Sequence, residues 1–494
     1  GVPTDPSWEA MWMIEPPPAA AMCGIAQRLI RKAPPTLTAK MRFQAARSSS
    51  RTVALGSLIA AAFTLNLATT PGTTGAAEGM IATDGLALLF GLLFLGSTIL
   101  VIMAASGYGR GASALPVEFE PLLLFACAGM MFMAASAELI TIYLSLELTG
   151  ITLYVLAALR RDARSSEAGL KYLLLGAVSS AVVLYGMVIL YALTGGTNLQ
   201  SVAASLAAAG SQNHEAVVLA AALLVAGFGF KLASVPFHMW VPDVYEGAPT
   251  PVTAFLSVAS KAAGFAVVLR LFHIGLGAPA LTADWTTMFG ALSLVTMTLG
   301  NIVAVQQQNI KRMMGYSSIA QAGYLMIGLA VAPQGGVNGI IFFLVSYAVT
   351  NLGAFIAIIA ITEHAGSEDI QDFGGVFHRS PLLALGLALC MLSLTGIPPT
   401  AGFFGKLFLF GAGVQNGLTG VVLVGVVNSV VSAYYYLGVV KALFVRPSGQ
   451  DVGITITPSL GLAFGVAVAA TLVLGFLPGP LLNAATAAAR GIFP

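Results

Sequence analysis

Four ionisable residues stand inside long apolar stretches of this sequence: Glu147, Lys231, Lys261 and Lys406. On insertion scales each charge costs about 2.5 to 3.5 kcal/mol, so the four together cost on the order of 10 kcal/mol. Desolvation and a nearby carboxylate act on a lysine in opposite directions, so a lysine whose carboxylate partner moves can bind and release a proton near neutral pH. The four residues are therefore candidates for a proton-transfer chain, with Glu147 and Lys231 as its candidate ion pair.

The same four residues have a second interpretation, in which they only hold helices together as ion pairs or snorkel to the membrane surface. For Arg270, Lys171 and Lys441, which fall near the ends of apolar stretches, snorkelling is the favoured interpretation. His238, Asp243 and Glu246 are expected at the membrane surface, in loop and interface roles, with proton entry as the alternative. Proton transfer and helix locking both remain open for the four central residues.

The elements that must position these residues are membrane helices. The 494 residues are 57% hydrophobic and only 9% charged, against about 25% charged in a soluble domain. Runs of about 20 apolar residues recur, which is the length of a membrane-spanning helix, whereas β-barrel strands would alternate over about 10 residues. The sequence predicts an all-α polytopic membrane protein with about thirteen spans, near residues 53–69, 85–105, 119–137, 138–159, 168–193, 215–241, 249–272, 286–305, 313–331, 337–361, 381–410, 417–444 and 456–477.

The positive-inside rule orients these spans. The connections on one side of the membrane carry the basic residues, whereas the connections between spans on the other side carry none. The side with the basic residues is the cytoplasm or the mitochondrial matrix. Arg490, after the last span, is the one basic residue on the other side. The basic connections hold Arg110, Arg160, Arg161, Arg164, Lys311, Arg312, Arg379 and Arg446.

Three regions are expected: a basic N-terminal extension at 1–52, a transmembrane domain at 53–478 and a C-terminal tail at 479–494. The segment 21–77 contains no Asp or Glu but seven Lys or Arg, with a serine run at 48–50. This composition is typical of a mitochondrial import signal, and a cytoplasmic tail that obeys the positive-inside rule is the alternative. We therefore expect the mitochondrial inner membrane, with the bacterial plasma membrane as the alternative.

Two spans contain prolines that should break the helix, because proline lacks a backbone donor and clashes with the preceding turn. Pro236 lies in the span 215–241, and Pro398 and Pro399 lie in "GIPPT" within the span 381–410. Lys231 precedes the first break and Lys406 follows the second. This opposite order is what two repeats of inverted topology would give, as in many transporters.

Several classes of site are not indicated. The three cysteines are far apart and form no CxxC pair, no histidine spacing suggests a metal site, and the sequence has no GxxxxGK[ST] phosphate loop. A net charge of +2 with scattered basic residues does not suggest nucleic acid as a partner. The chain therefore shows no cofactor or metal site of its own, and energy for pumping must come from partners or an ion gradient.

Three stretches closely resemble subunit N, or subunit 2, of respiratory complex I, the proton-pumping NADH:quinone oxidoreductase. They are "GFGFKLASVPFHMWVPDVYEGAPTPVTAFLSVASK", "KRMMGYSSIAQAGYLMIG" and "DFGGVFHRSPLLALGLALCMLSLTGIPPTAGFFGK". The resemblance implies two inverted five-helix repeats at the third to seventh and eighth to twelfth spans. It implies that Glu147 pairs with the broken-helix lysine Lys231, that Lys261 is the central lysine and that Lys406 belongs to the second broken helix.

The resemblance also implies partners and a driving reaction. Other membrane-arm subunits, including antiporter-like sister subunits, would adjoin the chain in the lipid bilayer. NADH, FMN, iron-sulfur clusters and quinone would bind to partner subunits, and quinone reduction there would drive proton pumping here. Bacterial members usually have fourteen spans, one more than this chain is predicted to have.

Three hypotheses follow. The favoured one is a proton-translocating subunit of complex I, which is part of an oxidoreductase but has no redox centre of its own. The second is a secondary cation/proton antiporter. The third is a membrane scaffold whose buried charges only hold helices together.

Overall fold

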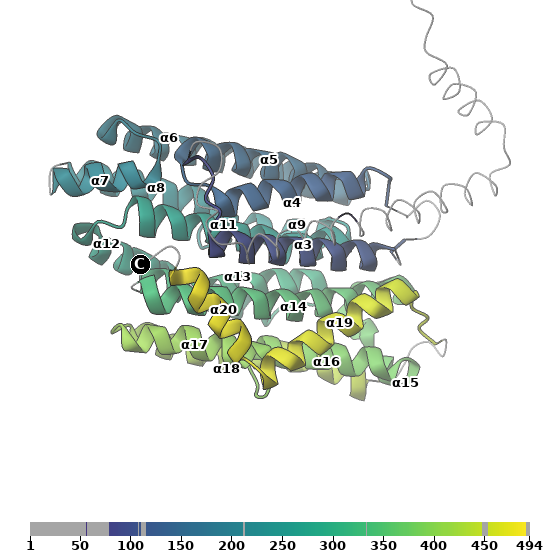
Figure 1. Ribbon diagram of the computed structural model, residues 1–494. Helices are drawn as coiled ribbons and strands as arrows, with labels where there is room; N and C mark the ends of the chain where they lie inside the picture. The colour runs from purple at the N-terminus through teal and green to yellow at the C-terminus, as the bar shows by residue number, and fades with distance from the viewer. Residues whose placement is uncertain are drawn as a thin grey trace, which may run out of the picture. The chain divides into compact units, whose positions relative to one another are not determined.

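The computed structural model describes residues 79–490, apart from 107, 110–114, 211–212, 332 and 447–452, together with Gly56. The N-terminal extension 1–52 and, except for Gly56, the first predicted span lie outside the described residues. The described part is almost entirely helical (Figure 1). Its elements are α3 (Gly85–Ala105), α4 (Phe119–Ala135), α5 (Leu139–Ala157), α6 (Ala163–Thr194), α7 (Leu199–Ala209), α8 (His214–Leu232), α9 (Trp240–Gly247), α10 (Thr250–Phe255), η5 (Leu256–Ser260), α11 (Lys261–Arg270), η6 (Leu271–Gly275), η7 (Pro279–Leu281), α12 (Thr282–Ala304), α13 (Ile310–Ala330), α14 (Pro333–Ala365), η8 (Ile370–Phe373), α15 (Val376–Arg379), α16 (Pro381–Thr395), α17 (Ala401–Gln415), α18 (Thr419–Val445), α19 (Pro458–Phe476) and α20 (Gly479–Arg490).

The long helices lie side by side, as membrane helices must when each satisfies its own backbone hydrogen bonds. In Figure 1, α4, α5 and α6 line one edge and α16, α17 and α18 line the opposite edge, with α3, α11, α13 and α14 between them. Among the described residues, nine helices are long and apolar enough to cross a membrane. Each predicted span from the second to the thirteenth contains a helix, so the predicted fold class is confirmed. The sixth span was predicted to end at 241, but the second half of its broken helix, α9, continues to Gly247, so Asp243 and Glu246 lie on a helix and not in a loop.

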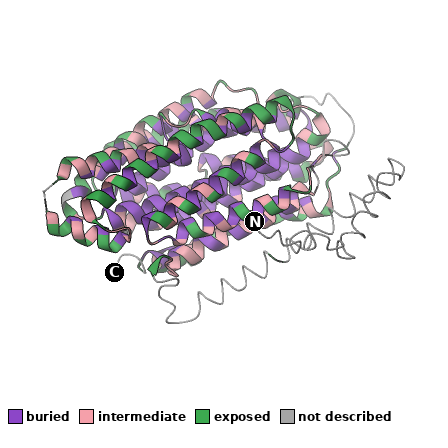
Figure 2. Ribbon diagram, turned by 90° about the horizontal axis from the view of Figure 1, so that it is seen from above, coloured by how far each residue is buried: buried purple, intermediate pink, exposed green. Residues whose placement is uncertain are grey.

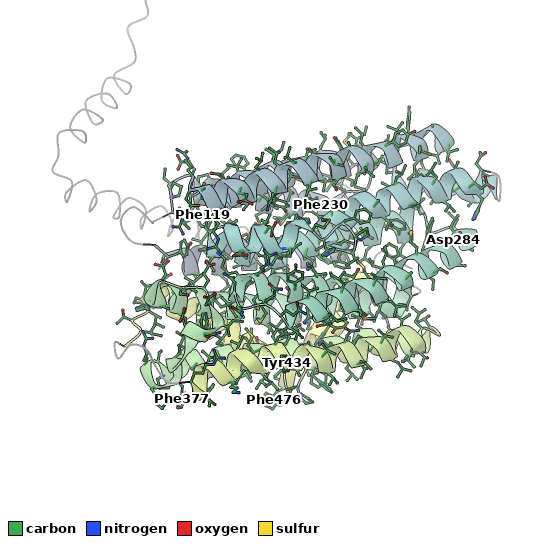
Figure 3. All side chains as sticks on the ribbon, turned by 180° about the vertical axis from the view of Figure 1, so that it is seen from behind. Phe119, Phe230, Asp284, Phe377, Tyr434 and Phe476 are labelled. Carbon is green, nitrogen blue, oxygen red and sulfur yellow. The ribbon has the colours of Figure 1, made fainter. Side chains whose placement is uncertain are left out.

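Burial separates an inner group of helices from an outer surface. Figure 2 shows buried residues through the middle of the described bundle and exposed residues on its outer helices. The segment Thr250–Gly275 is buried along the whole of its most apolar part, whereas only a third of the corresponding part of α18 is buried. Exposed side chains on the outer face, such as Tyr434, which Figure 3 labels on α18, are those that lipid or partner subunits would cover.

Both predicted helix breaks are present. Helix α8 ends at Leu232, and α9 begins at Trp240, beyond Pro236. Helix α16 ends at Thr395, and α17 begins at Ala401, beyond Pro398 and Pro399. Ala233 (φ +64°) and Gly396 (φ +95°) turn the chain out of the helix in the left-handed conformation that commonly ends helices.

The two halves of the bundle repeat the same connections. Two isolated antiparallel bridges join Glu138 to Asn198 and Asn309 to Asp369, and both close intervals of equal length along the chain. The first bridge precedes α5 and follows α6, and the second precedes α13 and follows α14. Because α5 and α13 run in opposite directions under the predicted orientation, these equivalent bridges lie at opposite membrane sides. They agree with the two inverted five-helix repeats expected at the third to seventh and eighth to twelfth spans, which are α4 to η6 and α12 to α18.

Three α-helices of the described residues lie outside every predicted span: α7, the one-turn α15 and α20. Helix α7 has eleven residues, too few to span a membrane, and packs against η6. Helix α20 occupies most of the expected C-terminal tail and packs on α3 and α14. Gly85 permits this contact, because a Cβ there would lie 2.8 Å from the Ala488 Cα. The Asn338 amide also donates a hydrogen bond to the Thr486 hydroxyl (3.3 Å).

Candidate proton-transfer site

Glu147 lies on α5 and faces α6. The Ser180 hydroxyl of α6 donates a hydrogen bond to the Glu147 carboxylate, and Ser180 also lies 3.4 Å from the Tyr143 hydroxyl. Glu147 is only partly buried, unlike the three lysines of the site. A half-buried carboxylate held by a hydroxyl is in a position to exchange protons with its surroundings.

Lys231 lies in the last turn of α8, directly before the first break, and is 5% exposed. The described ion pairs do not include Lys231 with Glu147, so the predicted pair is not in direct contact, although the two charges interact electrostatically. The Lys231 side chain packs against α11, where a Cβ on Gly264 would lie 3.2 Å from the Lys231 Cγ. Gly264 is three residues after Lys261, so Lys231 lies beside the helix face that carries the central lysine.

Lys261 begins α11, immediately after the π-helical turn η5, and is 3% exposed. Such π-helical turns are frequent at functional sites. The Lys261 ammonium donates hydrogen bonds to the Ser318 hydroxyl (2.5 Å) and to the Ser318 carbonyl. The Ser318 hydroxyl in turn lies 3.2 Å from the Tyr245 hydroxyl of α9. The partners of this buried lysine are thus neutral oxygens on α13.

Lys406 lies on α17 and is 6% exposed. Its ammonium donates to the Thr395 carbonyl (2.8 Å) at the end of α16 and to the Ser429 hydroxyl (3.2 Å) of α18, and it lies 4.7 Å from the centre of the Tyr324 ring. The last carbonyls of a helix have no partner within the helix and carry partial negative charge. The second break therefore supplies a ligand for the lysine that follows it.

A small cavity lies beside Lys406. It holds about 10 Å³ of space and is bordered by Lys406, Gln321, Tyr347 and Ser346, which is close to the room that one water requires. The Ser346 and Tyr347 hydroxyls are fully buried and have no hydrogen-bond partner among the described residues. Unpaired buried hydroxyls beside a cavity of this size are the arrangement in which a bridging water is expected.

The structure corrects the snorkelling expected for Arg270, which is buried, and it gives the partly exposed Lys171 acidic partners near the membrane surface. Arg270 is 2% exposed and holds Asp84 with two hydrogen bonds of 2.8 and 2.6 Å, while its Nε donates to the Ala134 carbonyl (2.6 Å). Lys171 forms ion pairs of 2.8 Å with both Asp243 and Glu167. The acidic partners of these two residues are remote in sequence or lie one helical turn away. A pattern of apolar residues does not reveal such partners. Lys441 is exposed, in agreement with snorkelling.

An ionic cluster on the basic side of the bundle was not predicted from the sequence. Lys311 is 3% exposed and pairs with Glu368 (2.7 Å), and Arg164 reaches both Glu368 (3.1 Å) and Glu246 (2.7 Å). Burial alone would raise the pKa of Glu368, but Lys311, the hydrogen bond from Asn309 and the charge of Arg164 together lower this pKa below its ordinary value of 4.5. The Asp and Glu residues within the basic connections were the available signal. The ionic cluster consists of Arg164, Glu167, Lys171, Asp243, Glu246, Lys311, Arg312 and Glu368.

Neither of these clusters resembles a metal or cofactor site. Within the described ranges, no group of three or more His, Cys, Asp or Glu side chains is placed to hold a metal ion. Cys127 and Cys390 are buried and unpaired with each other. What the arrangement offers chemically is a series of proton donors and acceptors: one carboxylate, three lysines, and hydroxyls between them.

Similar proteins identify the family of the chain. The family described as NADH:quinone oxidoreductase/Mrp antiporter, TM, matches residues 136–432. NADH-quinone oxidoreductase subunit N of Heliobacterium modesticaldum is 47% identical over 402 residues, which are 81% of this chain and 84% of the relative. NAD(P)H-quinone oxidoreductase subunit 2 of a Synechocystis species is 45% identical over 83% of this chain and 81% of the relative.

Solved structures agree with this assignment. A chain of respiratory complex I from Thermus thermophilus superimposes with a TM-score of 0.76 at 34% identity, covering 90% of this chain and 95% of that one. A chain of the Mrp complex from a Dietzia species shares the fold alone, with a TM-score of 0.79 at 22% identity over 93% and 96% of the two chains. The protein therefore belongs to the NADH:quinone oxidoreductase/Mrp antiporter transmembrane family and, within it, to the subunit N (subunit 2) group.

Proposed function

We propose that the chain is a proton-translocating subunit of the membrane arm of an NADH-quinone oxidoreductase, in which protons pass between Glu147, Lys231, Lys261 and Lys406. Its relatives at 42 to 47% identity are named as subunits of that oxidoreductase. Electron transfer from NADH to quinone, through FMN and iron-sulfur clusters, would take place on partner subunits and supply the energy. The neighbours would be other membrane-arm subunits, antiporter-like sister subunits among them.

The groups that contact the three lysines support proton transfer over helix locking. Lys231, Lys261 and Lys406 are each at most 6% exposed, yet none of them belongs to an ion pair among the described residues. A buried charge that only fastens helices requires a close opposite charge, because an unpaired one is strongly destabilising. Lysines held by neutral oxygens tolerate both the charged and the neutral form, which is what proton transfer needs.

The energy scale sets a requirement for the site. Moving one charge against about 100 mV costs about 2.3 kcal/mol, which corresponds to a change of roughly two pKa units in proton affinity during the cycle. Glu147 is the group whose movement or protonation could produce such a change at Lys231, because it is the carboxylate that acts on this lysine. The relatives named above are bacterial and cyanobacterial, which supports the bacterial plasma membrane as the location.

Substitution in the assembled oxidoreductase tests the proposal. Glu147→Gln, Lys231→Met, Lys261→Met and Lys406→Met should each lower the number of protons pumped per electron while the complex still assembles and oxidises NADH. Lys441→Met is the matched control, because Lys441 is exposed on α18 and should leave pumping unchanged. Unchanged proton-to-electron ratios in all four site variants would reject the proposed path.

The antiporter alternative has a separate test. The Mrp complex resembles the chain in fold, so exchange of cations for protons by the isolated chain is the competing activity. Purified chain in liposomes with an imposed sodium or proton gradient should show no exchange without NADH and quinone. Exchange that Lys231→Met abolishes would favour the antiporter instead.

A further inference from the structure

The inverted repeats share one numbering offset. Adding 171 to both residue numbers of the bridge between Glu138 and Asn198 gives the bridge between Asn309 and Asp369. The same constant carries the start of α5 (139) to the start of α13 (310), and the end of α6 (194) to the end of α14 (365). Bridges and helix ends therefore agree on the same register, so residues of α5 and α6 have defined counterparts on α13 and α14.

This register places Ser318 at the position of Glu147, and Asn351 at the position of Ser180. In the first repeat Ser180 donates a hydrogen bond to Glu147. In the second repeat no hydrogen bond among the described residues joins the two counterparts, and each bonds instead to the helical segment from η5 to α11 that carries Lys261. Ser318 accepts hydrogen bonds from the Lys261 ammonium, and Asn351 donates to the Ser257 hydroxyl (2.6 Å), one helical turn before Lys261.

The two equivalent positions differ in the charge of their side chains. Where the first repeat has a carboxylate, the second has a hydroxyl at the equivalent position, and that hydroxyl is fully buried against the central lysine. A carboxylate there would form a short buried ion pair with Lys261 and favour its charged form throughout the cycle. A hydroxyl fixes the direction of the ammonium without binding its proton permanently.

We propose that Ser318 is a positioning residue for Lys261: the second repeat replaces the carboxylate of the first with a neutral hydroxyl that aims the central lysine toward α13 and leaves its proton transferable. Tyr245, 3.2 Å from the Ser318 hydroxyl, completes the oxygen group. This inference rests on the proposed function, because it assigns Ser318 a task within the same proton path.

Three variants of Ser318 in the assembled oxidoreductase test it. Ser318→Ala removes the hydroxyl and should lower the proton-to-electron ratio to a value between that of the unaltered complex and that of Lys261→Met. Ser318→Thr keeps a hydroxyl and should restore pumping. Ser318→Asp supplies the carboxylate of the first repeat and should reduce pumping to the level of Lys261→Met. Native gel electrophoresis and the rate of NADH oxidation confirm that each variant is assembled.

The control is Ser293→Ala on α12. Ser293 is also fully buried and donates one hydrogen bond to α13, to the Gly323 carbonyl (2.7 Å). Its replacement by alanine therefore removes a buried interhelical hydrogen bond, as Ser318→Ala does. The assembled complex with Ser293→Ala should pump normally. Ser318→Ala should also add nothing to Lys261→Met in the double variant, because it acts through that lysine.

Normal pumping by assembled Ser318→Ala, or by Ser318→Asp, would overturn the inference. If Glu147→Gln and Lys231→Met lose pumping in the same experiment, the proposed function stands and only the role of Ser318 fails. If all of these variants pump normally, the proposed function fails as well.

Discussion

At the scale of single residues, the site is distinguished by what holds the lysines. Lys261 and Lys406 each have a backbone carbonyl and a serine hydroxyl as hydrogen-bond acceptors, and Lys406 has an aromatic face in addition. Such neutral ligands stabilise an ammonium less than a carboxylate does. These ligands therefore permit a positive charge on each lysine inside the membrane without holding the lysine in its charged form.

The aromatic contact of Lys406 yields a prediction. Tyr324→Leu removes the ring below the ammonium, a contact worth about 0.5 to 2 kcal/mol, and should lower the proton-to-electron ratio of the assembled complex. Tyr324→Phe keeps the ring and should pump normally, although it loses the hydrogen bond from Asn301 (3.0 Å).

Tyr435→Phe is the control for that comparison. The Tyr435 hydroxyl donates to the same Asn301 (2.9 Å), but no contact joins Tyr435 to Lys406 among the described interactions. Equal pumping by the leucine and phenylalanine variants of Tyr324 would show that the ring does not act on Lys406.

At the scale of elements, the broken helices and the ionic cluster have different tasks. The break between α16 and α17 gives Lys406 a helix-end carbonyl as a ligand. The ionic cluster instead fastens α6 and α9 of the first repeat to α13 and the segment after α14 of the second. The cluster therefore fixes the relative position of the two repeats on the basic side, where α9 leads into the helix that carries Lys261.

This fastening predicts a dependence on pH. Because the pKa of Glu368 is lowered in the folded protein, its contribution to stability is present above about pH 4.5, the ordinary value, and is lost as the pH falls through the lowered value. The part of the thermal stability of the complex in detergent that comes from Glu368 should therefore be lost on acidification below about pH 4.5.

The matched variant is Glu368→Gln, which cannot be protonated further. It should be less stable than the unaltered protein at pH 7, because it leaves the buried Lys311 without its carboxylate, and its stability should change less on acidification. Parallel loss of stability in both proteins would place the pH dependence elsewhere.

The sequence predicted what depends on local pattern and missed what depends on distant contact. Apolar runs and prolines predicted the spans and both breaks, since each of these features is determined within a single span. The partners of Arg270, 186 residues away at Asp84, and of Lys311, 57 residues away at Glu368, could not be found in this way. Likewise Ser318 looks like an ordinary helix residue until the fold sets it against Lys261.

At the scale of the whole molecule, the inverted repeats put equivalent features on opposite sides of the membrane. The ionic cluster lies with the basic connections, while the Asp84 and Arg270 pair lies at the other ends of the helices. Figure 3 labels Phe119 and Phe377 at one end of the bundle and Asp284 at the other, which marks these two sides. A path that begins in one repeat and ends in the other therefore joins two structures with opposite orientation.

This orientation can be measured with two added cysteines. Ser166→Cys lies in the first turn of α6, beside Arg164 on the basic side, and Gln415→Cys ends α17 on the opposite side, and both positions are exposed. The native Cys127 and Cys390 are buried and should not react, and Cys23 is replaced by serine in the background. By the positive-inside rule, a membrane-impermeant maleimide should label Ser166→Cys only in inside-out vesicles and Gln415→Cys only in right-side-out cells or spheroplasts. Labelling of both from one side would mean that an even number of spans separates them, which the register of the two repeats forbids.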